Sequence, residues 1–452
     1  MIIRWAHRCR KLVCHPGKMS FAELAEKLDI DEAKMPGSLP LKRKMGDLDP
    51  DAIRVMQWNV LAGGMSQDGF LVADIIDEAK ATKMDLGPAT DLKQIYEDVK
   101  AVKKAGGDLA TLQEKFTTPR AEKNLLATVA WDLRWARMKD IIAAAQPSVI
   151  TFQEMDHMAE VQSDLAKLGY ACSVSPDARY APVHKAALPE GDRKEYLQHL
   201  KSVGVAYAPG SSSTCRKIAL GRGETNADDD GVGIFWHAAA FEPREIDFHP
   251  ANKKGCSAVV RASLTRKSDN FQFCVLCAHL KSGDSAEDEA GRITELTVPV
   301  SGFSSSTMDW LQESISKSPT LFCLDANSAP TRTDATTVWK TLCSFDGVES
   351  VWSDKFSPDG TPKSLPAPVT TNKMRGPLSQ QTKKIGEHMC HVIDHIFFSS
   401  EFSMIEHAFP PLCYESVDDA AADLLPTLAI PSDHSPVIVD FQCKLSAGIV
   451  SL

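Results

Sequence analysis

Several short apolar runs in this chain end in a side chain that could take part in catalysis. The run Leu321–Leu324 predicts a buried strand, and Asp325 and Asn327 follow it directly. In an extended backbone, residues two apart lie on the same side. A carboxylate beside a carboxamide offers acceptors for a metal or water and a donor for a phosphate oxygen. An Asx turn after the strand is the alternative interpretation, since Asp and Asn are common turn residues.

The same pattern recurs along the chain. Asn59, Glu154, His279 and His434 each lie at an end of a predicted strand, and these strands are Ile53–Trp58, Ser148–Gln153, Phe271–Leu280 and Ser435–Phe441. Polar residues at the ends of core strands usually meet at one rim of a sheet, where loops gather and sites form. Each alone could be a cap or a hydrogen-bonded core residue. Their recurrence predicts one shared site.

Asp394 lies inside the apolar run Val392–Phe398, at a position that predicts burial. An ionised carboxylate there costs several kcal/mol unless it is paired. A histidine is a natural partner, because a carboxylate fixes the tautomer of the imidazole and raises its basicity. His434 is our candidate for this partner. Hydrogen bonds from backbone N–H groups to Asp394 are the alternative.

Histidines, carboxylates and asparagines without a serine or cysteine nucleophile motif favour metal-assisted hydrolysis. The pattern Cys274-Val-Leu-Cys277 lies in a predicted strand, where the two thiols would face opposite ways, so neither zinc nor redox chemistry is favoured. Mostly oxygen ligands favour Mg²⁺ or Mn²⁺, with substrate phosphates completing the shell.

The elements that would position these residues form one large domain over residues 51–445. Residues 1–50 predict a basic tail, a short helix (Phe21–Ala33) and a linker. Two insertions are expected, a helical region at residues 62–130 and a long loop at residues 171–230. Amphipathic spacing predicts a helix over Trp131–Ala145, and further strands are expected at Gly231–His237 and Cys256–Thr265. Residues 358–384 read as a loop.

Composition limits the function classes. The chain has 452 residues, and its net charge of −10 argues against wholesale binding of nucleic acid through a basic surface. Its 12 cysteines are scattered, many of them inside apolar runs, which favours reduced thiols in a cytoplasmic protein. No apolar run reaches the roughly 18 residues of a transmembrane helix. The first 22 residues are basic and contain no acid, a pattern compatible with mitochondrial targeting or with a basic tail.

Six motifs, in order, resemble those of the endonuclease/exonuclease/phosphatase superfamily: Gln57-Trp-Asn-Val-Leu61, Phe152-Gln-Glu154, Ala278-His-Leu280, Leu324-Asp-Ala-Asn327, Val392–Phe398 and Pro431-Ser-Asp-His434. Arg134-Trp135, Thr370–Arg375 and Cys390–Asp394 are similar to its nocturnin and carbon-catabolite-repressor deadenylase branch. The chain departs from that pattern at Ala278, Leu324 and Ala326. Ser282 and Gly283 follow Lys281 where basic residues would grip a nucleotide 2′-phosphate.

The resemblance implies an α+β fold, a four-layer αββα sandwich like that of deoxyribonuclease I, with helical and loop insertions. It implies catalytic roles for His279, Asp325, Asn327, Asp394 and His434. Metal ligands would be Glu154, Asn59 and Asp433, holding Mg²⁺ or Mn²⁺. Substrate contacts would come from Asn59, Lys281, Asn372, Lys373 and Arg375.

The activity implied first is a 3′–5′ exoribonuclease on single-stranded, poly(A)-like RNA. The alternatives are an NADP(H) 2′-phosphatase and a catalytically inactive binding module. Lys253 and Lys254 are further candidates for contacts with an RNA backbone, since such proteins track phosphates with basic side chains.

Overall fold

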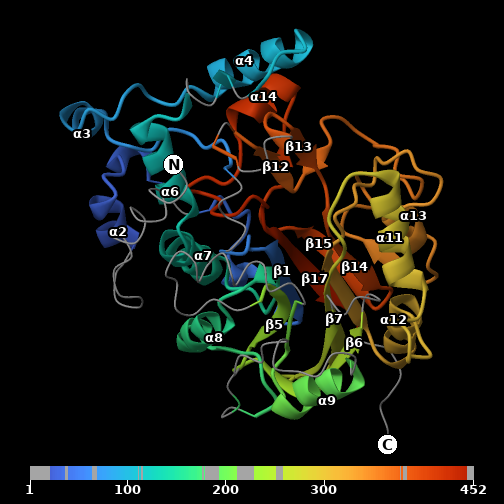
Figure 1. Ribbon diagram of the computed structural model, residues 1–452. Coiled ribbons are helices and arrows are strands. Elements are labelled where there is room, and N and C mark those ends of the chain that lie inside the picture. The colour runs from blue at the N-terminus through green and yellow to red at the C-terminus, as the bar shows by residue number, and fades with distance from the viewer. Residues whose placement is uncertain are drawn as a thin grey trace, which may run out of the picture.

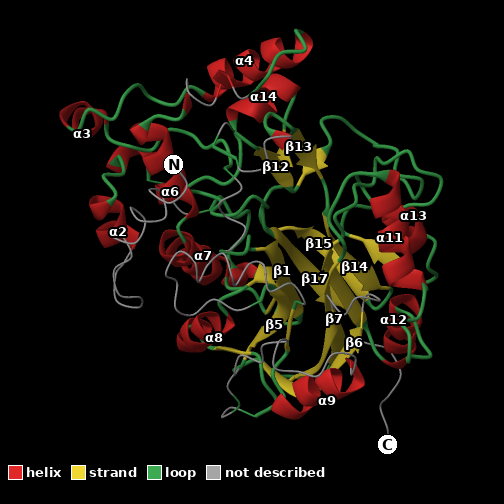
Figure 2. Ribbon diagram, viewed as in Figure 1, coloured by secondary structure: helices red, strands yellow, loops and turns green. Residues whose placement is uncertain are grey.

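A computed structural model describes residues 21–35, 39–63, 69–109, 111–112, 116–175, 178, 193–210, 229–250, 258–376, 378–379 and 384–444. Two large β-sheets form its centre (Figures 1 and 2). Residues 1–20 of the predicted basic tail, and Lys253 and Lys254, lie outside the described residues.

The first sheet has the strand order β15-β17-β1-β2-β5-β3, with β4 also paired to β5. Its strands are β15 (Phe402–His407), β17 (Val437–Cys443), β1 (Ala52–Asn59), β2 (Val149–Met155), β5 (Gly231–His237), β3 (Tyr170–Ala171) and β4 (Tyr207–Pro209). The second sheet has the order β10-β14-β9-β8-β7-β6. Its strands are β10 (Val348–Ser350), β14 (Asp394–Ser399), β9 (Thr320–Asp325), β8 (Gln272–His279), β7 (Ala258–Arg266) and β6 (Phe241–Pro250).

The two sheets pack face to face, and helices cover both outer faces. β1 and β2 contact β14 and β8 across the interior, which is filled by one apolar cluster. Helices α7 (Trp131–Ala145) and α8 (Met158–Lys167) cover the first sheet. Helices α11 (Ala286–Thr297), α12 (Thr307–Lys317) and α13 (Val338–Cys343) cover the second sheet. This arrangement confirms the predicted four-layer αββα sandwich.

Strand alternation explains how β1 serves two layers. Ile53 and Val55 point into the space between the sheets, whereas Met56 and Trp58 pack under α7. Continuing this alternation places Gln57 and Asn59 on the inner side with Ile53 and Val55. Polar residues on the inner face of a core strand need partners, because buried polar groups without hydrogen bonds are costly.

Four strand ends meet at one end of the sandwich. β1 runs parallel to β2, and β8 runs parallel to β9, so their carboxyl ends face the same way. In register, Asn59 lies beside Gln153 in the first sheet. In the second sheet Asp325 lies between His279 and Asp394. The predicted site residues are therefore brought to one edge of the interior.

The region 62–130 is helical, as predicted. It contains α3 (Glu78–Lys83), α4 (Leu92–Lys104) and α6 (Pro119–Val129). It packs against α7 and against α14 (Val417–Ala422). The preceding α2 (Phe21–Lys27) is shorter than the predicted helix, and the one-turn helices Glu32–Lys34 and Met45–Asp47 follow it. Ile30 pairs with Ile76, so this segment contacts the insertion rather than extending from the domain.

Two loop predictions need correction, and one strand was missed. The region 171–230 contains α9 (Arg193–Val203) and β4, and α9 packs against β6. The strand β6 was not predicted, because its sequence FEPREIDFHP carries charges and two prolines. Residues 358–384 contain β11 (Pro368–Val369) and β12 (Thr371–Met374), which pair with β16 (Leu412–Cys413) and β13 (His388–His391). Their partners are distant in sequence, so local pattern did not reveal them.

None of the helices in the described residues is long and apolar enough to cross a membrane.

Candidate active site

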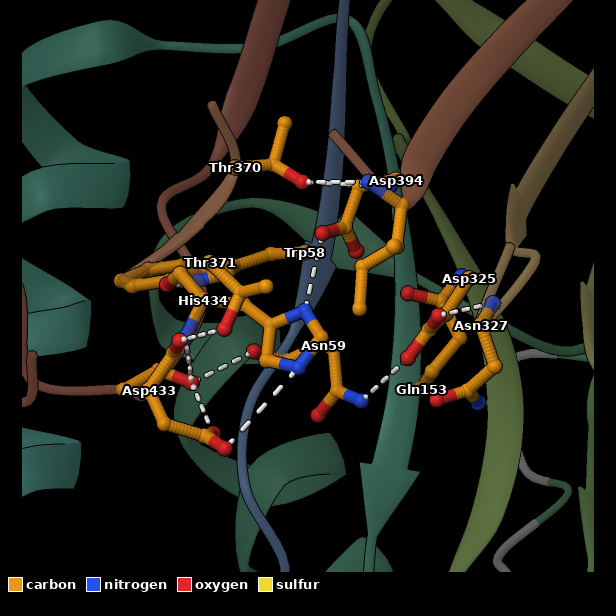
Figure 3. A network of polar contacts seen from close by, with 12 residues as sticks. Trp58, Asn59, Gln153, Asp325, Asn327, Thr370, Thr371, Asp394, Asp433 and His434 are labelled. Carbon is orange, nitrogen blue, oxygen red and sulfur yellow. Dashed lines mark hydrogen bonds and ion pairs between the residues drawn. The ribbon is translucent and has the colours of Figure 1, made fainter. Parts of the chain in front are cut away.

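Two carboxylates, one from each sheet, share a single amide donor. Asn59 Nδ2 donates to Glu154 Oε1 at 3.0 Å and to Asp325 Oδ2 at 2.8 Å. The Oδ1 atom of Asn59 accepts the backbone N–H of Leu61 at 3.0 Å. Asn59 therefore positions the two carboxylates, and its own oxygen accepts a backbone N–H, while its role as a metal ligand stays a prediction (Figure 3).

Glu154 reaches this position through an irregularity in β2. Simple alternation would place Glu154 on the outer face with Phe152, which packs in the cluster under α7. The β2–β5 register shifts between Phe152 and Met155, and Glu154 has a left-handed backbone with φ of 55°. A bulge of this kind re-aims a side chain. Here it brings the Glu154 carboxylate to the inner end of the sandwich.

Asp325 and Asn327 form both a turn and part of the site. Asn327 has φ of 48°, and its N–H donates to Asp325 Oδ1 at 2.8 Å, which is an Asx turn. The other carboxylate oxygen, Oδ2, faces Asn59. Asn327 Nδ2 lies 3.0 Å from His279 Nε2 and also donates to the Leu280 carbonyl. The two interpretations of this stretch are therefore compatible.

His279 completes the cluster. Its Nε2 lies 3.5 Å from Asp325 Oδ2 and 3.9 Å from Glu154 Oε1. Its side chain is 20% exposed, against 1% for Asp325. The imidazole is therefore the more accessible member, as suits a group that contacts a ligand entering from solvent.

His434 and Asp394 form the buried pair that the sequence predicted. His434 Nδ1 lies 2.8 Å from Asp394 Oδ2, and both side chains are buried. Indole N–H groups hold the two backbones in place, since Trp58 donates to the His434 carbonyl and Trp352 donates to the Asp394 carbonyl. Figure 3 shows His434 between Asp394 and Asp433.

The environment of His434 favours its protonated form. Burial by itself would lower the pKa of His434, but the carboxylates of Asp394 and Asp433 outweigh it and raise this pKa to about 9. At neutral pH the imidazole is therefore a cation with two N–H donors. One donor is used by Asp394, and Nε2 remains to act on another group.

Asp433 is paired differently from our prediction. It forms an ion pair with Lys373 and lies 3.9 Å from His434 Nε2. Burial opposes the charge of Lys373, yet Asp433 raises the pKa of this lysine. Asp433 is not a member of either group of potential metal ligands found among the described residues. The second-metal role stays a prediction, and the observed role is to neutralise Lys373 beside His434.

The predicted substrate contacts divide into three cases. Asn372 is buried, its Nδ2 donates to the Ala420 and Asp423 carbonyls, and its Oδ1 contacts His388, so a substrate contact stays a prediction for this residue too. Lys281 is half-exposed and paired with Asp288. Arg375 follows β12, and its backbone bridges to Phe70 of the helical insertion. Contacts of Lys281, Lys373 and Arg375 with a substrate stay predictions.

Several residues that support the site lay inside the motifs but had no role assigned from sequence. Ser432 Oγ donates to the Asn59 carbonyl at 2.7 Å, which ties the His434 loop to β1. Arg134 donates to the carbonyls of Val60 and Leu61, which fixes the turn after Asn59. Thr370 Oγ1 accepts the N–H of Asp394. These contacts join segments far apart in sequence, so only the motif positions could have suggested them.

The cluster fits a divalent cation. One ligand atom each from Glu154, His279 and Asp325 lie within 4.8 Å of one another. Two carboxylates sharing one amide donor leave negative charge that is only partly compensated, and oxygen-rich sites of this kind suit hard cations. Asp325, Asp394 and His434 satisfy the same distance criterion. Asp394 and His434 are already hydrogen-bonded to each other, so the first group is the better candidate.

Comparison with known proteins gives the following matches. No family model matches the chain. The chain is 23% identical over 327 residues to nocturnin of Drosophila melanogaster, covering 70% of this chain and 42% of that protein. It is 24% identical over 318 residues to nocturnin of Rattus norvegicus, covering 69% of this chain and 59% of that protein. The chain thus spans less than two thirds of the length of either relative.

Solved structures were compared as well. The human nocturnin catalytic domain with bound sulfate has a TM-score of 0.47 and 19% identity, covering 89% of this chain and 99% of that one. ANGEL2, described as a 2′,3′-cyclic phosphatase, in complex with adenosine-2′,3′-vanadate has a TM-score of 0.48 and 13% identity, covering 90% and 100%.

The αββα sandwich gathers carboxylates and imidazoles at its carboxyl-end rim, and the motifs that resemble those of the endonuclease/exonuclease/phosphatase superfamily supply these residues. In sequence, the chain is similar to nocturnins at 23% to 24% identity.

Proposed function

We propose that the chain is a divalent-metal-dependent hydrolase of phosphate esters carried by nucleotides. The observation that carries this proposal is the contact of Glu154 and Asp325 through Asn59, with His279 and the His434–Asp394 pair at the same rim. Carboxylates that hold a cation and imidazoles that donate to a phosphate are the groups that phosphoester hydrolysis requires.

Each group has a distinct role in this proposal. Glu154 and Asp325 would hold the cation, with His279 adjacent. A bound divalent cation would supply positive charge beside the phosphate oxygens and make water a better nucleophile. Asn327 would donate to the scissile phosphate, as predicted from the sequence, by exchanging the contact of its Nδ2 with His279 Nε2 for one with the phosphate.

His434 would act as a hydrogen-bond donor toward the phosphate. Its raised pKa keeps it protonated near neutral pH, with Nδ1 held by Asp394 and Nε2 free of that bond. Of the two roles open for this residue, general base or stabiliser of the developing charge, we propose the second. Removing one such donor costs on the order of 3 kcal/mol of transition-state stabilisation.

Two substrate classes follow from the resemblance, the 3′ end of poly(A)-like RNA and the 2′-phosphate of NADP(H). One observation favours a compact substrate over a long single strand. Single-strand binders stack bases on exposed aromatic side chains. No aromatic side chain whose burial is described is exposed in this structure. We therefore propose that the site contacts a single nucleotide, free or at an RNA terminus.

The test uses the full chain with Mg²⁺ or Mn²⁺ and two substrates, 5′-labelled oligo(A) and NADPH. Glu154→Gln removes one carboxylate charge from the site, and Glu349→Gln on the exposed edge strand β10 is the matched control. We expect turnover by the wild type and by Glu349→Gln, and its loss in Glu154→Gln. Release of AMP identifies the exoribonuclease, and release of phosphate identifies the phosphatase. If neither substrate is turned over with metal, the inactive binding module becomes the better interpretation.

A further inference from the structure

Gln57 is a buried amide in the middle of the site that the reaction scheme above does not use. It lies on β1, two residues before Asn59, and its side chain is fully buried between the sheets. Its Nε2 donates to Asp394 Oδ1 at 3.0 Å across the sandwich. The same nitrogen donates to Gln153 Oε1 at 2.7 Å on the neighbouring strand β2.

This contact completes the hydrogen bonds of the Asp394 carboxylate. Oδ2 of Asp394 is occupied by His434 Nδ1, and Oδ1 receives the Gln57 amide. The Asp394 backbone is held separately, by Thr370 Oγ1 and by the Trp352 indole. The backbone contacts do not fix the χ1 and χ2 torsions of Asp394. Gln57 thus orients the carboxylate itself.

The orientation of the Gln57 amide is set by its neighbours. Turned the other way, its oxygen would face a carboxylate oxygen and the Gln153 oxygen, with no proton to share. In the observed orientation Gln57 Oε1 is buried and has no hydrogen-bond partner. A buried acceptor without a partner lowers the stability of the fold. An apolar residue would fill the same space in β1 without that cost, so packing alone does not account for an amide here.

We propose that Gln57 is a positioning residue that fixes the Asp394 carboxylate so that it holds the His434 imidazole in its working orientation. The catalytic consequence rests on the phosphoester hydrolase proposed above, whereas the hydrogen-bond geometry does not. Partners that orient a functional histidine through a carboxylate are typically worth about 10- to 100-fold in activity. Gln57 is fully buried, and its amide donates to Asp394 and Gln153 rather than to a carboxylate of the cation-binding cluster.

The first test does not depend on activity. In ¹H NMR spectra of the full chain, the Nδ1 proton of His434 gives a downfield resonance if it is held against Asp394 and shielded from water. His434→Asn assigns that resonance by abolishing it. Gln57→Met keeps the length of the side chain and removes the donor. Thr151→Val is the matched control, because Thr151 is the buried inward-facing neighbour of Gln57 on β2 and does not contact Asp394.

We expect the His434 resonance to be sharp in the wild type and in Thr151→Val, and to broaden or shift in Gln57→Met. A wild-type spectrum without this resonance would overturn the proposal even if no variant folds. An unchanged resonance in a folded Gln57→Met protein would overturn it as well.

The second test measures steady-state kinetics on whichever substrate the wild type turns over. Gln57→Met should lower kcat by roughly 10- to 100-fold with KM nearly unchanged, while Thr151→Val keeps wild-type kcat. A wild type without activity counts against the proposed hydrolase and leaves the NMR result to decide the role of Gln57. An active wild type with equal kcat in Gln57→Met counts against the positioning role alone.

Discussion

Asn59 works at this site through its nitrogen, because Nδ2 donates to carboxylates of both sheets while Oδ1 is held by a backbone N–H. Without that donor, Glu154 and Asp325 would face each other with no proton between them. The residue thus reduces carboxylate repulsion in a part of the chain where Asp325 is almost fully buried. Any cation that enters takes over part of this task.

Asn59→Leu should therefore lower the free energy of unfolding by about 2 kcal/mol in the absence of divalent metal, since it strands two acceptors. Activity should fall at least tenfold. Asn124→Leu is the control, a fully buried asparagine of the helical insertion that donates to Asp74. It should lose comparable stability and keep its kcat. Urea titrations and initial rates measure both quantities. Equal loss of kcat in the two variants would contradict a specific role for Asn59.

At the residue scale, the sequence predicted which residues form the site better than it predicted where their side chains point. Residue types at strand ends correctly brought Asn59, Glu154, His279 and Asp325 together. The direction of Glu154 depends on a bulge in β2, which alternation does not predict. Asn372 lies in a motif next to Lys373, yet strand alternation turns it toward α14, where it binds backbone carbonyls.

At the scale of elements, α11 connects the loop that follows His279 at the end of β8 with the loop that carries Asn327 after β9. Glu289 is buried in that helix, and its Oε1 accepts from Ser328 Oγ and from the Val338 N–H. Its other oxygen pairs with Arg292, which donates to the carbonyls of Lys281 and Gly283. One buried ion pair therefore fixes the loop after β8 and the loop after β9.

Glu289→Ala should lower the free energy of unfolding by about 3–5 kcal/mol, because it leaves the Arg292 charge buried without its partner. Glu287→Ala, an exposed position of the same helix, should cost less than about 1 kcal/mol. A Glu289→Leu/Arg292→Met double variant should recover part of the loss, since no lone charge remains. Chemical denaturation measures all three. Equal stability of Glu289→Ala and Glu287→Ala would contradict this role of the pair.

A second element-scale prediction concerns His407, which links β15 to the turn after β10. Its ring stacks on Trp352 and its Nε2 contacts the Val351 carbonyl. Burial lowers the pKa of His407 to about 4, from an ordinary value near 6.5. The unfolded chain therefore binds a proton before the folded chain does. The resulting stability is fully present above about pH 6.5 and is lost as the pH falls toward 4.

The shift corresponds to about 3 kcal/mol. We expect the unfolding free energy of the wild type, relative to His407→Gln, to decrease by up to this amount between pH 7 and pH 4. Denaturant titrations at several pH values measure the difference between the two proteins, so acid effects shared by both cancel. A difference that does not change with pH would contradict a neutral buried His407.

The elements themselves were partly predictable from the sequence. The strands β5, β8, β9 and β17 carry continuous apolar stretches and were predicted close to their observed bounds. β6 was missed because its sequence carries charges and two prolines, although its main partner, β7, is the next strand in the chain. β12 was missed because it is short and mostly polar, with the sequence TNKM. Glu245 and Asp247 of β6 pair with Lys201 of α9, and β12 pairs with β13. Local pattern carries no information about such partners.

At the scale of the whole molecule, the site exists only when the two sheets are assembled. Glu154 belongs to the first sheet and Asp325 to the second, and Asn59 is the side chain that joins them. A cation bound between these carboxylates would bind the folded chain and not the unfolded one. Binding of this kind raises the free energy of unfolding, by about 2.7 kcal/mol when the metal concentration is 100 times its Kd.

The melting temperature of the wild type should therefore rise with added Mg²⁺ or Mn²⁺ relative to EDTA. Glu154→Gln should respond differently from the wild type to added metal. Without metal it should be close to the wild type in stability, because the loss of one of two facing charges offsets the loss of one acceptor: the glutamine oxygen can accept from Asn59, but its NH2 group then faces the Ala62 N–H. With metal it should gain little. Glu349→Gln, far from the cluster on β10, should respond like the wild type. Calorimetric melting with and without metal decides the matter, and a metal-dependent rise of equal size in Glu154→Gln would show that the cation binds elsewhere on the chain.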